Sequence, residues 1–246
     1  MPMAQSRADR PAFYALQPGG WRDLVTLLHP PYTLWHLSYV GLGAAAAPTL
    51  HGDRLAAALG AFFLGVGVCA HALDELNGRP LGTRISDAGL IALAAASLGG
   101  AVGLGVVGVA TIGASLVPFI IAGAFIVVAY NLELFGGRFH TDFWFAAAWG
   151  AFPALTAYWA NAVSIELEGV LVTVACFAIS LAQRRLSTPV RMLRRRTAAV
   201  SGTVTLEDGE VLELTKESLA APLDGALRAL AAGVVLLAAA MVILRL

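Results

Sequence analysis

Charged residues are scarce in this chain of 246 residues, since only 13% are Asp, Glu, Lys or Arg and 58% are hydrophobic. A soluble globular domain has about 25% charged and about 45–50% apolar residues. The longest uncharged run, from residue 88 to residue 132, is too long for one helix across a hydrocarbon core about 30 Å thick, which takes about 20 residues. The sequence therefore predicts an integral membrane protein.

The chain also has no formal net charge and only two cysteines. The 16 basic residues balance the 16 acidic ones, so no bulk electrostatic field favours nucleic acid as a partner. The two cysteines, Cys69 and Cys176, lie in apolar segments, which predicts buried thiols rather than a disulfide framework. Residues 1–20 carry both signs of charge and no apolar core, so they are not expected to be a cleaved signal.

Apolar runs predict an all-α bundle of about seven membrane-spanning helices. A short amphipathic segment, Trp21–Leu28, precedes them and is expected at the membrane interface. The glycine-rich stretch 102–113 is expected to turn the chain and to divide the long uncharged run into two spans. The predicted spans are 32–50, 54–76, two within 88–132, 143–163, 169–182 with its flanks, and 223–244.

The positive residues predict the orientation of these spans. They gather in alternate connections, whereas the other connections carry only Arg54 beside Asp53 and the acids Glu166 and Glu168. By the positive-inside rule, the basic segments face the cytoplasm. We therefore expect a multi-pass protein of the inner (plasma) membrane with a cytoplasmic N-terminus, and a site where the segments after spans two, four and six meet. The basic positions are Arg7, Arg10, Arg22, Arg79, Arg84, Arg138 and the run 184–196.

A β-hairpin is predicted between the last two spans. Residues 203–214 alternate apolar and polar side chains around Asp208-Gly209, which is a strong short-range hairpin signal. A lone two-stranded hairpin is marginal in water, so it is expected to pack on the cytoplasmic face or on a partner protein; an ordered linker without chemistry is the alternative. The chain then divides into a cytoplasmic N-terminal tail (1–20), a transmembrane bundle (21–196), a cytoplasmic hairpin insert (197–222) and a C-terminal helix (223–246).

Three ionisable residues end the second span. His71, Asp74 and Glu75 are spaced i, i+3 and i+4, so they are predicted to share one helical face, at a depth where ionisable groups are costly and functional by default. Carboxylates suit Mg²⁺, and a histidine among them admits Mn, Fe or Zn. The alternative is a charged helix end in which Asp74 or Glu75 pairs with Arg79.

Two further segments are suited to bind phosphate. Gly136-Gly137 bends the chain before the fifth span with Arg138 beside it, and backbone amides at such a bend can cradle phosphate. An ordinary interfacial loop, in which Asp142 caps the next helix, is the alternative. Arg184 and Arg185 begin a basic run that either attracts anionic headgroups, at about 1 kcal/mol per residue, or holds a phosphate group directly.

At these residues the chain resembles the UbiA-type membrane prenyltransferase superfamily. The likeness covers about residues 21–196 and lies in the proline-marked start of the first span (24–35), in Arg79-Pro80-Leu81 followed by residues 82–86, and in the stretches 130–140 and 143–158. The resemblance implies a helical bundle with a lateral cavity open to lipid. In that family, Asp-rich motifs hold Mg²⁺ on a prenyl diphosphate, which ionises in an apolar chamber and alkylates an acceptor.

The family motifs are matched only in part. The first Asp-rich motif is matched at Asp74, with Glu75 as its neighbour, and Gln183-Arg184-Arg185 stands where the second motif would be. The resemblance implies a divergent prenyltransferase-like enzyme that binds an isoprenoid diphosphate or another lipid, with Mg²⁺ or another divalent metal. Its catalytic residues would be Asp74 and Glu75, its metal ligands His71, Asp74, Glu75 and His140, and its substrate-binding residues Arg79, Asn131, Arg138, Arg184 and Arg185.

Two other functions stay open. The missing second Asp-rich motif, with the hairpin as a docking surface, favours a non-catalytic protein that binds a lipid or a partner protein. Alternatively, a redox metal centre would make the chain a membrane oxidase or hydroxylase, with ligands from His71, Asp74, Glu75, Glu133 and His140. A transporter is less well supported, because the spans lack paired broken helices at mid-membrane depth.

Overall fold

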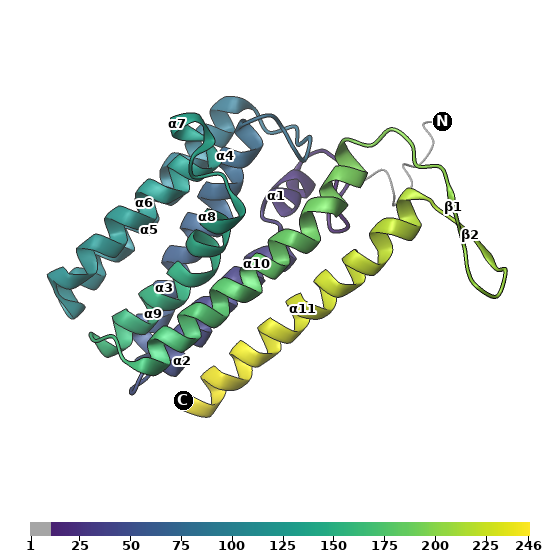
Figure 1. Ribbon diagram of the computed structural model, residues 1–246. Helices are drawn as coiled ribbons and strands as arrows, with labels where there is room; N and C mark the ends of the chain where they lie inside the picture. Colours follow the sequence, from purple (N-terminus) through teal and green to yellow (C-terminus); the bar gives the residue numbers. More distant parts are fainter. Residues whose placement is uncertain (1–10) are drawn as a thin grey trace.

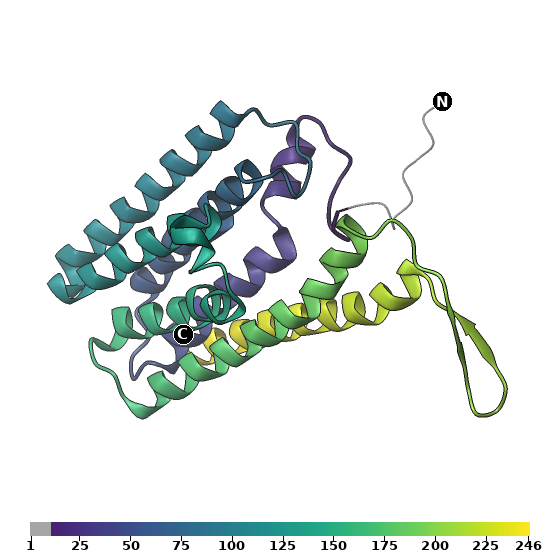
Figure 2. The ribbon, with the colours of Figure 1, turned by 45° about the horizontal axis from the view of Figure 1, so that its top comes forward.

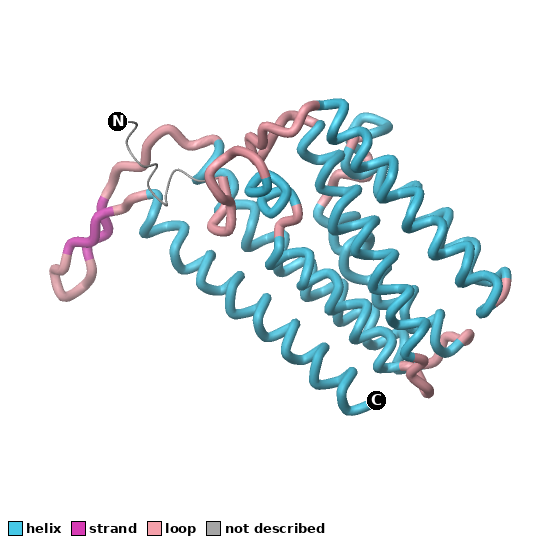
Figure 3. Tube along the Cα trace, turned by 180° about the vertical axis from the view of Figure 1, so that it is seen from behind, coloured by secondary structure: helices cyan, strands magenta, loops and turns pink. Residues whose placement is uncertain are grey.

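The computed structural model describes residues 11–246, so the first half of the predicted N-terminal tail lies outside the described residues. Nearly all regular structure is helical, and the long helices run side by side in one bundle (Figures 1 and 3). Within residues 11–246, five helices are long and apolar enough to cross a membrane, which makes the chain a multi-pass membrane protein. They are α3–η2–α4 (Gly52–Leu76), α5 (Asp87–Ile112), η3–α6 (Ala114–Asn131), α10 (Leu167–Arg195) and α11 (Lys216–Arg245).

Two more helical segments lie where the first and fifth spans are predicted. One is α2 (Pro30–Ala46), and the other joins α8 (Asp142–Ala146), the π-helical η4 (Ala147–Ala151) and α9 (Phe152–Ala162). Helix α2 packs against α9 and α11, with Trp35 and Tyr39 fully buried. These two segments therefore form the inside of the bundle.

The long uncharged run divides into two helices, as predicted. Helix α5 begins after Ser86, whose hydroxyl accepts a hydrogen bond from the Gly89 amide. It ends at Ile112, and Gly113 then adopts φ 111°, a conformation that glycine takes without the steric cost of a Cβ atom. The turn therefore lies at the C-terminal end of the glycine-rich stretch.

The basic run after the sixth predicted span is helical rather than a loop. Helix α10 continues to Arg195 with Pro189 inside it. Helix α11 likewise begins before residue 223, at Lys216, because Thr215 and Ser218 form a reciprocal capping box. The connection between the two helices is correspondingly shorter than predicted.

The predicted hairpin is present, but it does not pack on the bundle. Strand β1 (Thr203–Thr205) pairs with β2 (Val211–Glu213) in antiparallel register, with Val204 opposite Leu212. Every residue of both strands is exposed, and the hairpin stands away from the helices (Figures 1 and 2). Hence, within residues 11–246, the expected packing on the end of the bundle does not occur.

The amphipathic segment forms α1 (Trp21–Leu27), but its polar and apolar sides differ from expectation. Trp21 is 68% exposed and Asp23 is only 4% exposed. The Asp23 carboxylate accepts hydrogen bonds from the amides of Gly19 (2.9 Å) and Arg84 (3.1 Å). Asp23 is thus buried because it ties α1 to the connection between α4 (His71–Leu76) and α5.

Candidate functional site

A polar cavity of about 340 Å³ lies at the end of the bundle where α4, the α6–α8 connection and the C-terminal half of α10 meet. It also receives side chains from the segment before α1 and from α2. Besides three tyrosines, its ionisable lining residues are three arginines (Arg184, Arg191, Arg195), four histidines (His29, His36, His71, His140) and three acids (Asp74, Glu133, Asp224). The fold thereby gathers charged groups from both halves of the sequence into one chamber.

Five of the residues predicted for the prenyltransferase-like site line this cavity: His71, Asp74, Asn131, His140 and Arg184. Glu133, predicted only as a ligand of the redox alternative, lines it as well. The five come from four separate places in the fold: α4, the end of α6, the connection before α8, and α10. Helix α4 follows directly on the π-helical η2 (Phe63–Ala70). The convergence of the segments after spans two, four and six, which the sequence analysis predicts, is therefore seen in the structure.

Arg138 and Arg185 are exposed and do not line the cavity. Arg138 follows the short α7 (Leu134–Gly137), while Arg185 lies on the outer side of α10. Arg184, their neighbour in the predicted set, does line it, and its guanidinium is paired with the Asp142 carboxylate at 3.0 Å.

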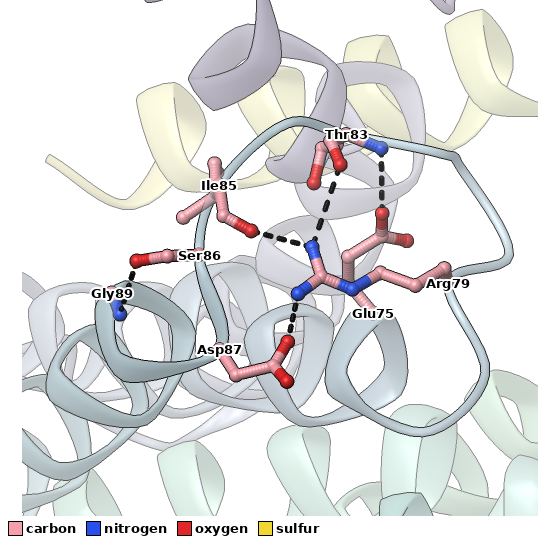
Figure 4. A network of polar contacts seen from close by, with 7 residues as sticks. All are labelled: Glu75, Arg79, Thr83, Ile85, Ser86, Asp87 and Gly89. Carbon is pink, nitrogen blue, oxygen red and sulfur yellow. Dashed lines mark hydrogen bonds and ion pairs between the residues drawn. The ribbon is translucent and has the colours of Figure 1, made fainter.

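The Glu75 carboxylate is engaged by the loop after α4 and does not join His71 and Asp74 in the cavity. This carboxylate, only 1% exposed, accepts from the amides of Thr83 (2.7 Å) and Leu81 (2.9 Å), the first of which is drawn in Figure 4. Buried backbone amides need a hydrogen-bond acceptor, and the Glu75 carboxylate is the acceptor for these two amides of the α4–α5 loop. Within residues 11–246, no group of three or more His, Cys, Asp or Glu side chains is placed to hold a metal ion, so the predicted trio is not brought together.

Arg79 also serves the loop between α4 and α5. Its guanidinium donates to the carbonyl oxygens of Thr83 and Ile85 and pairs with the Asp87 carboxylate (Figure 4). Arg79 does not line the cavity. The predicted alternative in which Arg79 pairs with Asp74 or Glu75 is therefore wrong, because Asp87 is its partner.

Two cavity arginines were missed in the sequence analysis. Arg191 donates to the Thr188 hydroxyl (3.2 Å) and Arg195 donates to the Pro11 carbonyl (3.3 Å), and within residues 11–246 neither is in an ion pair. With Arg184 they are spaced i, i+7 and i+11, which is one face of a helix. Extending the helical periodicity past residue 183 would have placed the three on one face, but the sequence does not show that this face points into the cavity.

The cavity histidines have fixed orientations. The ring of His29 stacks on His71 with centroids 4.0 Å apart. His71 Nδ1 lies 3.0 Å from the Gly67 carbonyl oxygen in η2, and His36 Nδ1 lies 2.9 Å from the Trp149 carbonyl oxygen in η4. Both π-helical segments thus present carbonyl oxygens that position imidazole rings in the cavity.

Four buried polar atoms on the cavity wall have no hydrogen-bond partner within the described chain: His29 Nε2, Tyr130 Oη, Gln183 Oε1 and Asp224 Oδ1. Leaving such an atom unsatisfied costs about 1–3 kcal/mol, and natural proteins rarely do so without a reason. The wall therefore offers both donors and acceptors to a polar ligand.

An apolar cavity of about 310 Å³ adjoins the polar one. The two share Val66 in η2 and Trp149 in η4 as lining residues. The apolar cavity lies between α3, α5, α6 and α9, and Asp53 and Arg54 line its other end. Because π-helical segments recur at functional sites, their position at the junction marks the two cavities as one amphipathic site.

The pH dependence of stability is expected to report on His29. Burial, and next the neighbouring His71 ring, lower the pKa of His29 well below its usual value. The unfolded chain takes up this proton as the pH falls through about 6.5, whereas the folded chain does not. Stability should therefore be highest above that pH and should fall below it.

His29→Asn tests this expectation, because asparagine tolerates the left-handed conformation of residue 29 (φ 46°) and does not titrate. Thermal unfolding of the detergent-solubilised protein, measured between about pH 8 and pH 5, should show a smaller loss of stability for the variant than for the wild type. Equal pH slopes for the two proteins would contradict the role given to His29.

Comparison of the chain with protein-family models, curated proteins and solved structures finds no match in any of the three. Function is therefore inferred from the two cavities. A chamber with two arginines outside any described ion pair suits an anionic group, and an adjoining apolar chamber between membrane helices suits a hydrocarbon chain.

Proposed function

We propose that this chain is a divergent UbiA-like membrane protein that binds an isoprenoid diphosphate and acts as a prenyltransferase-like enzyme. The observation that carries the proposal is the junction of a polar, arginine-bearing cavity with an apolar cavity at Val66 and Trp149. A prenyl diphosphate has the same two parts, a multiply charged head and a branched hydrocarbon tail.

The head group is proposed to bind Arg191 and Arg195. Each guanidinium can bind phosphate oxygens through two parallel hydrogen bonds, and both lie one turn apart on the cavity side of α10. Arg184 supports the head from the rim, where Asp142 and the Phe145 ring, 5.3 Å from its guanidinium carbon, hold it in place. His140, stacked on Tyr130 at 4.5 Å, lies on the same wall.

The tail is proposed to pass between Val66 and Trp149 into the apolar cavity. Phe62, Ile120 and Phe152 are among the side chains that line it. Removing isoprenoid carbon from water contributes about 0.8 kcal/mol per buried CH₂, so this chamber would supply much of the affinity and would hold the reacting end away from bulk water.

Asp74 fits a single Mg²⁺ contact. It lines the polar cavity, and Mg²⁺ is commonly bound through one or two carboxylates together with substrate phosphates. When bound, the ion would neutralise charge on the diphosphate leaving group. Within the chain, Asp74 would orient the head toward Arg191 and Arg195, while the stacked His71 and His29 rings form part of the same cavity wall.

The finer topology belongs to the same proposal. Helix α2 and the α8–η4–α9 segment would be the first and fifth of seven spans. Because the cavity end carries exposed arginines, we propose from the positive-inside rule that this end, with the N-terminus, lies on the cytoplasmic side of the plasma membrane.

A non-catalytic binding protein is the second candidate, and Gln183 favours it. This residue stands where the family's second Asp-rich motif would be, is 3% exposed and lines the polar cavity with a neutral amide. The polar cavity therefore has Asp74 on one side of the proposed head group but no carboxylate from the second motif on the other side. Release of pyrophosphate from bound prenyl diphosphate, in the presence of an acceptor, would separate an enzyme from a binder.

The proposal is tested by the dependence of affinity on tail length. Purified protein with Mg²⁺ should bind geranylgeranyl diphosphate more tightly than geranyl diphosphate, and both more tightly than inorganic pyrophosphate. Val66→Phe should narrow the junction and weaken binding of the longest diphosphate by about tenfold or more, as expected when several CH₂ groups stay in water, with little effect on pyrophosphate.

Val106→Phe is the matched control, because Val106 is 59% exposed on α5 and outside both cavities. It should bind the whole series as the wild type does. Equal affinity of the wild type for pyrophosphate and for geranylgeranyl diphosphate would rule out the tail site.

A further inference from the structure

The hairpin has one apolar face. Val204 pairs with Leu212, and the ladder continues through hydrogen bonds from the Leu206 amide to the Glu210 carbonyl (2.8 Å) and from the Leu214 amide to the Gly202 carbonyl (2.9 Å). Because side chains alternate across a strand, residues 204, 206, 212 and 214 lie on one side. Val204 and Leu212 are 42% and 43% exposed, so this apolar face is uncovered.

The hairpin is also strongly acidic. Residues 203–214 hold four carboxylates, Glu207, Asp208, Glu210 and Glu213, and no basic residue. None of the four is in an ion pair within the described chain. An anionic lipid surface would repel this segment, so the membrane is not the surface that the apolar face fits.

The hairpin does not fold back onto the end of the bundle from which it projects. It runs sideways from the end of the bundle, away from α10 and α11 (Figures 1, 2 and 3). A side-by-side neighbour in the same membrane would present its own end at the same height. The surface within reach of the hairpin would then be the exposed end of another membrane protein.

The same end of this chain carries the opposite charge. Exposed arginines lie there on α1, on the α4–α5 loop, on the α7–α8 connection, on the outer side of α10 and at its C-terminal cap, and within residues 11–246 none of them is in an ion pair. They are Arg22, Arg84, Arg138, Arg185 and Arg196. A second copy therefore offers a basic surface at the height at which the acidic hairpin projects.

We propose that the hairpin docks on the basic end of a second copy of this chain, and that the second copy returns the contact. Such an exchange has two-fold symmetry and closes as a dimer. Charge complementarity sets the orientation, and burial of Val204, Leu206, Leu212 and Leu214 supplies apolar area. The exchange also gives a marginal two-stranded hairpin the packing that it needs to be stable.

The test uses the full-length protein in detergent, with mass measured by light scattering or native mass spectrometry. The wild type should be a dimer that dissociates as salt is raised, because screening weakens exposed charge pairs. Reversing the hairpin charge with Glu207→Lys, Asp208→Lys and Glu210→Lys should raise the dimer dissociation constant by about tenfold or more. Glu166→Lys, an exposed reversal at the start of α10, should leave it unchanged.

A mixing experiment identifies the docking surface. A variant with residues 203–214 replaced by a Gly-Ser linker should be monomeric alone, but it should pair with wild type, since it keeps the basic end. Unchanged thermal unfolding of the helical bundle would show that the variant folds. A monomeric wild type, or pairing that requires hairpins on both partners, would overturn the proposal.

Discussion

Replacing Arg191 with glutamine is expected to lower the affinity for geranylgeranyl diphosphate by about 30-fold, which corresponds to the loss of one hydrogen-bonded charge contact of about 2 kcal/mol. Arg191 lines the polar cavity and, apart from the Thr188 hydroxyl at 3.2 Å, has no hydrogen bond within the described chain. Glutamine keeps a polar side chain of moderate length but removes the positive charge. The loss therefore reports on charge rather than on packing.

Arg185→Gln is the control on the same helix, because Arg185 is exposed and outside the cavity. It should bind like the wild type in calorimetric titrations at matched salt. Adding Arg195→Gln to Arg191→Gln should abolish measurable binding, since both proposed phosphate contacts are then lost. Binding of wild-type strength by Arg191→Gln would remove α10 from the proposed head-group site.

Replacing Glu75 with alanine is expected to lower the free energy of unfolding by about 3 kcal/mol or more, because two hydrogen bonds to a buried charged acceptor are lost and two buried amides are left unsatisfied. The carboxylate accepts from Leu81 and Thr83, which are themselves 5% and 7% exposed. Water cannot readily replace an acceptor in so enclosed a place. The loop from α4 to α5 should lose its fixed path.

Glu75→Gln and Glu166→Ala separate this effect from a general loss of charge. Glutamine fills the same space but presents a donor where one amide needs an acceptor, so it should destabilise the protein less than alanine yet measurably. Glu166→Ala, at the exposed start of α10, should be neutral. Thermal or chaotrope unfolding in detergent is the measurement, and a Glu75→Ala protein as stable as the wild type would contradict the structural role.

Much of the fold could be read from hydropathy and turn signals. The uncharged run 88–132 divides at Gly113, the Asp208-Gly209 hairpin forms, and Cys69 and Cys176 are free and buried as predicted. These features depend on local sequence, through the length of apolar runs and the conformational freedom of glycine. The start of α11 was misplaced because its Thr215–Ser218 cap lies outside the apolar pattern.

The sequence predicted where the candidate site lies, but it did not predict all of the residues that line it. His71, Asp74, Asn131, His140 and Arg184 do meet in one cavity, because they flank the ends of apolar runs. Helical spacing placed Glu75 beside Asp74. The Glu75 carboxylate is instead hydrogen-bonded by backbone amides of the loop that follows α4. A sequence pattern cannot show which buried donor a side chain will satisfy.

The sequence by itself determined that this is a helical membrane protein with its arginines concentrated at one end, since hydrophobic length and charge placement are properties of the chain. Only the tertiary structure decided which of those arginines face inward, because Arg191 and Arg195 are distinguished from Arg185 by the packing of α10. The junction at Val66 and Trp149 was decided in the same way. It arises where η2 and η4 come together, and contact between distant segments depends on packing rather than on local pattern.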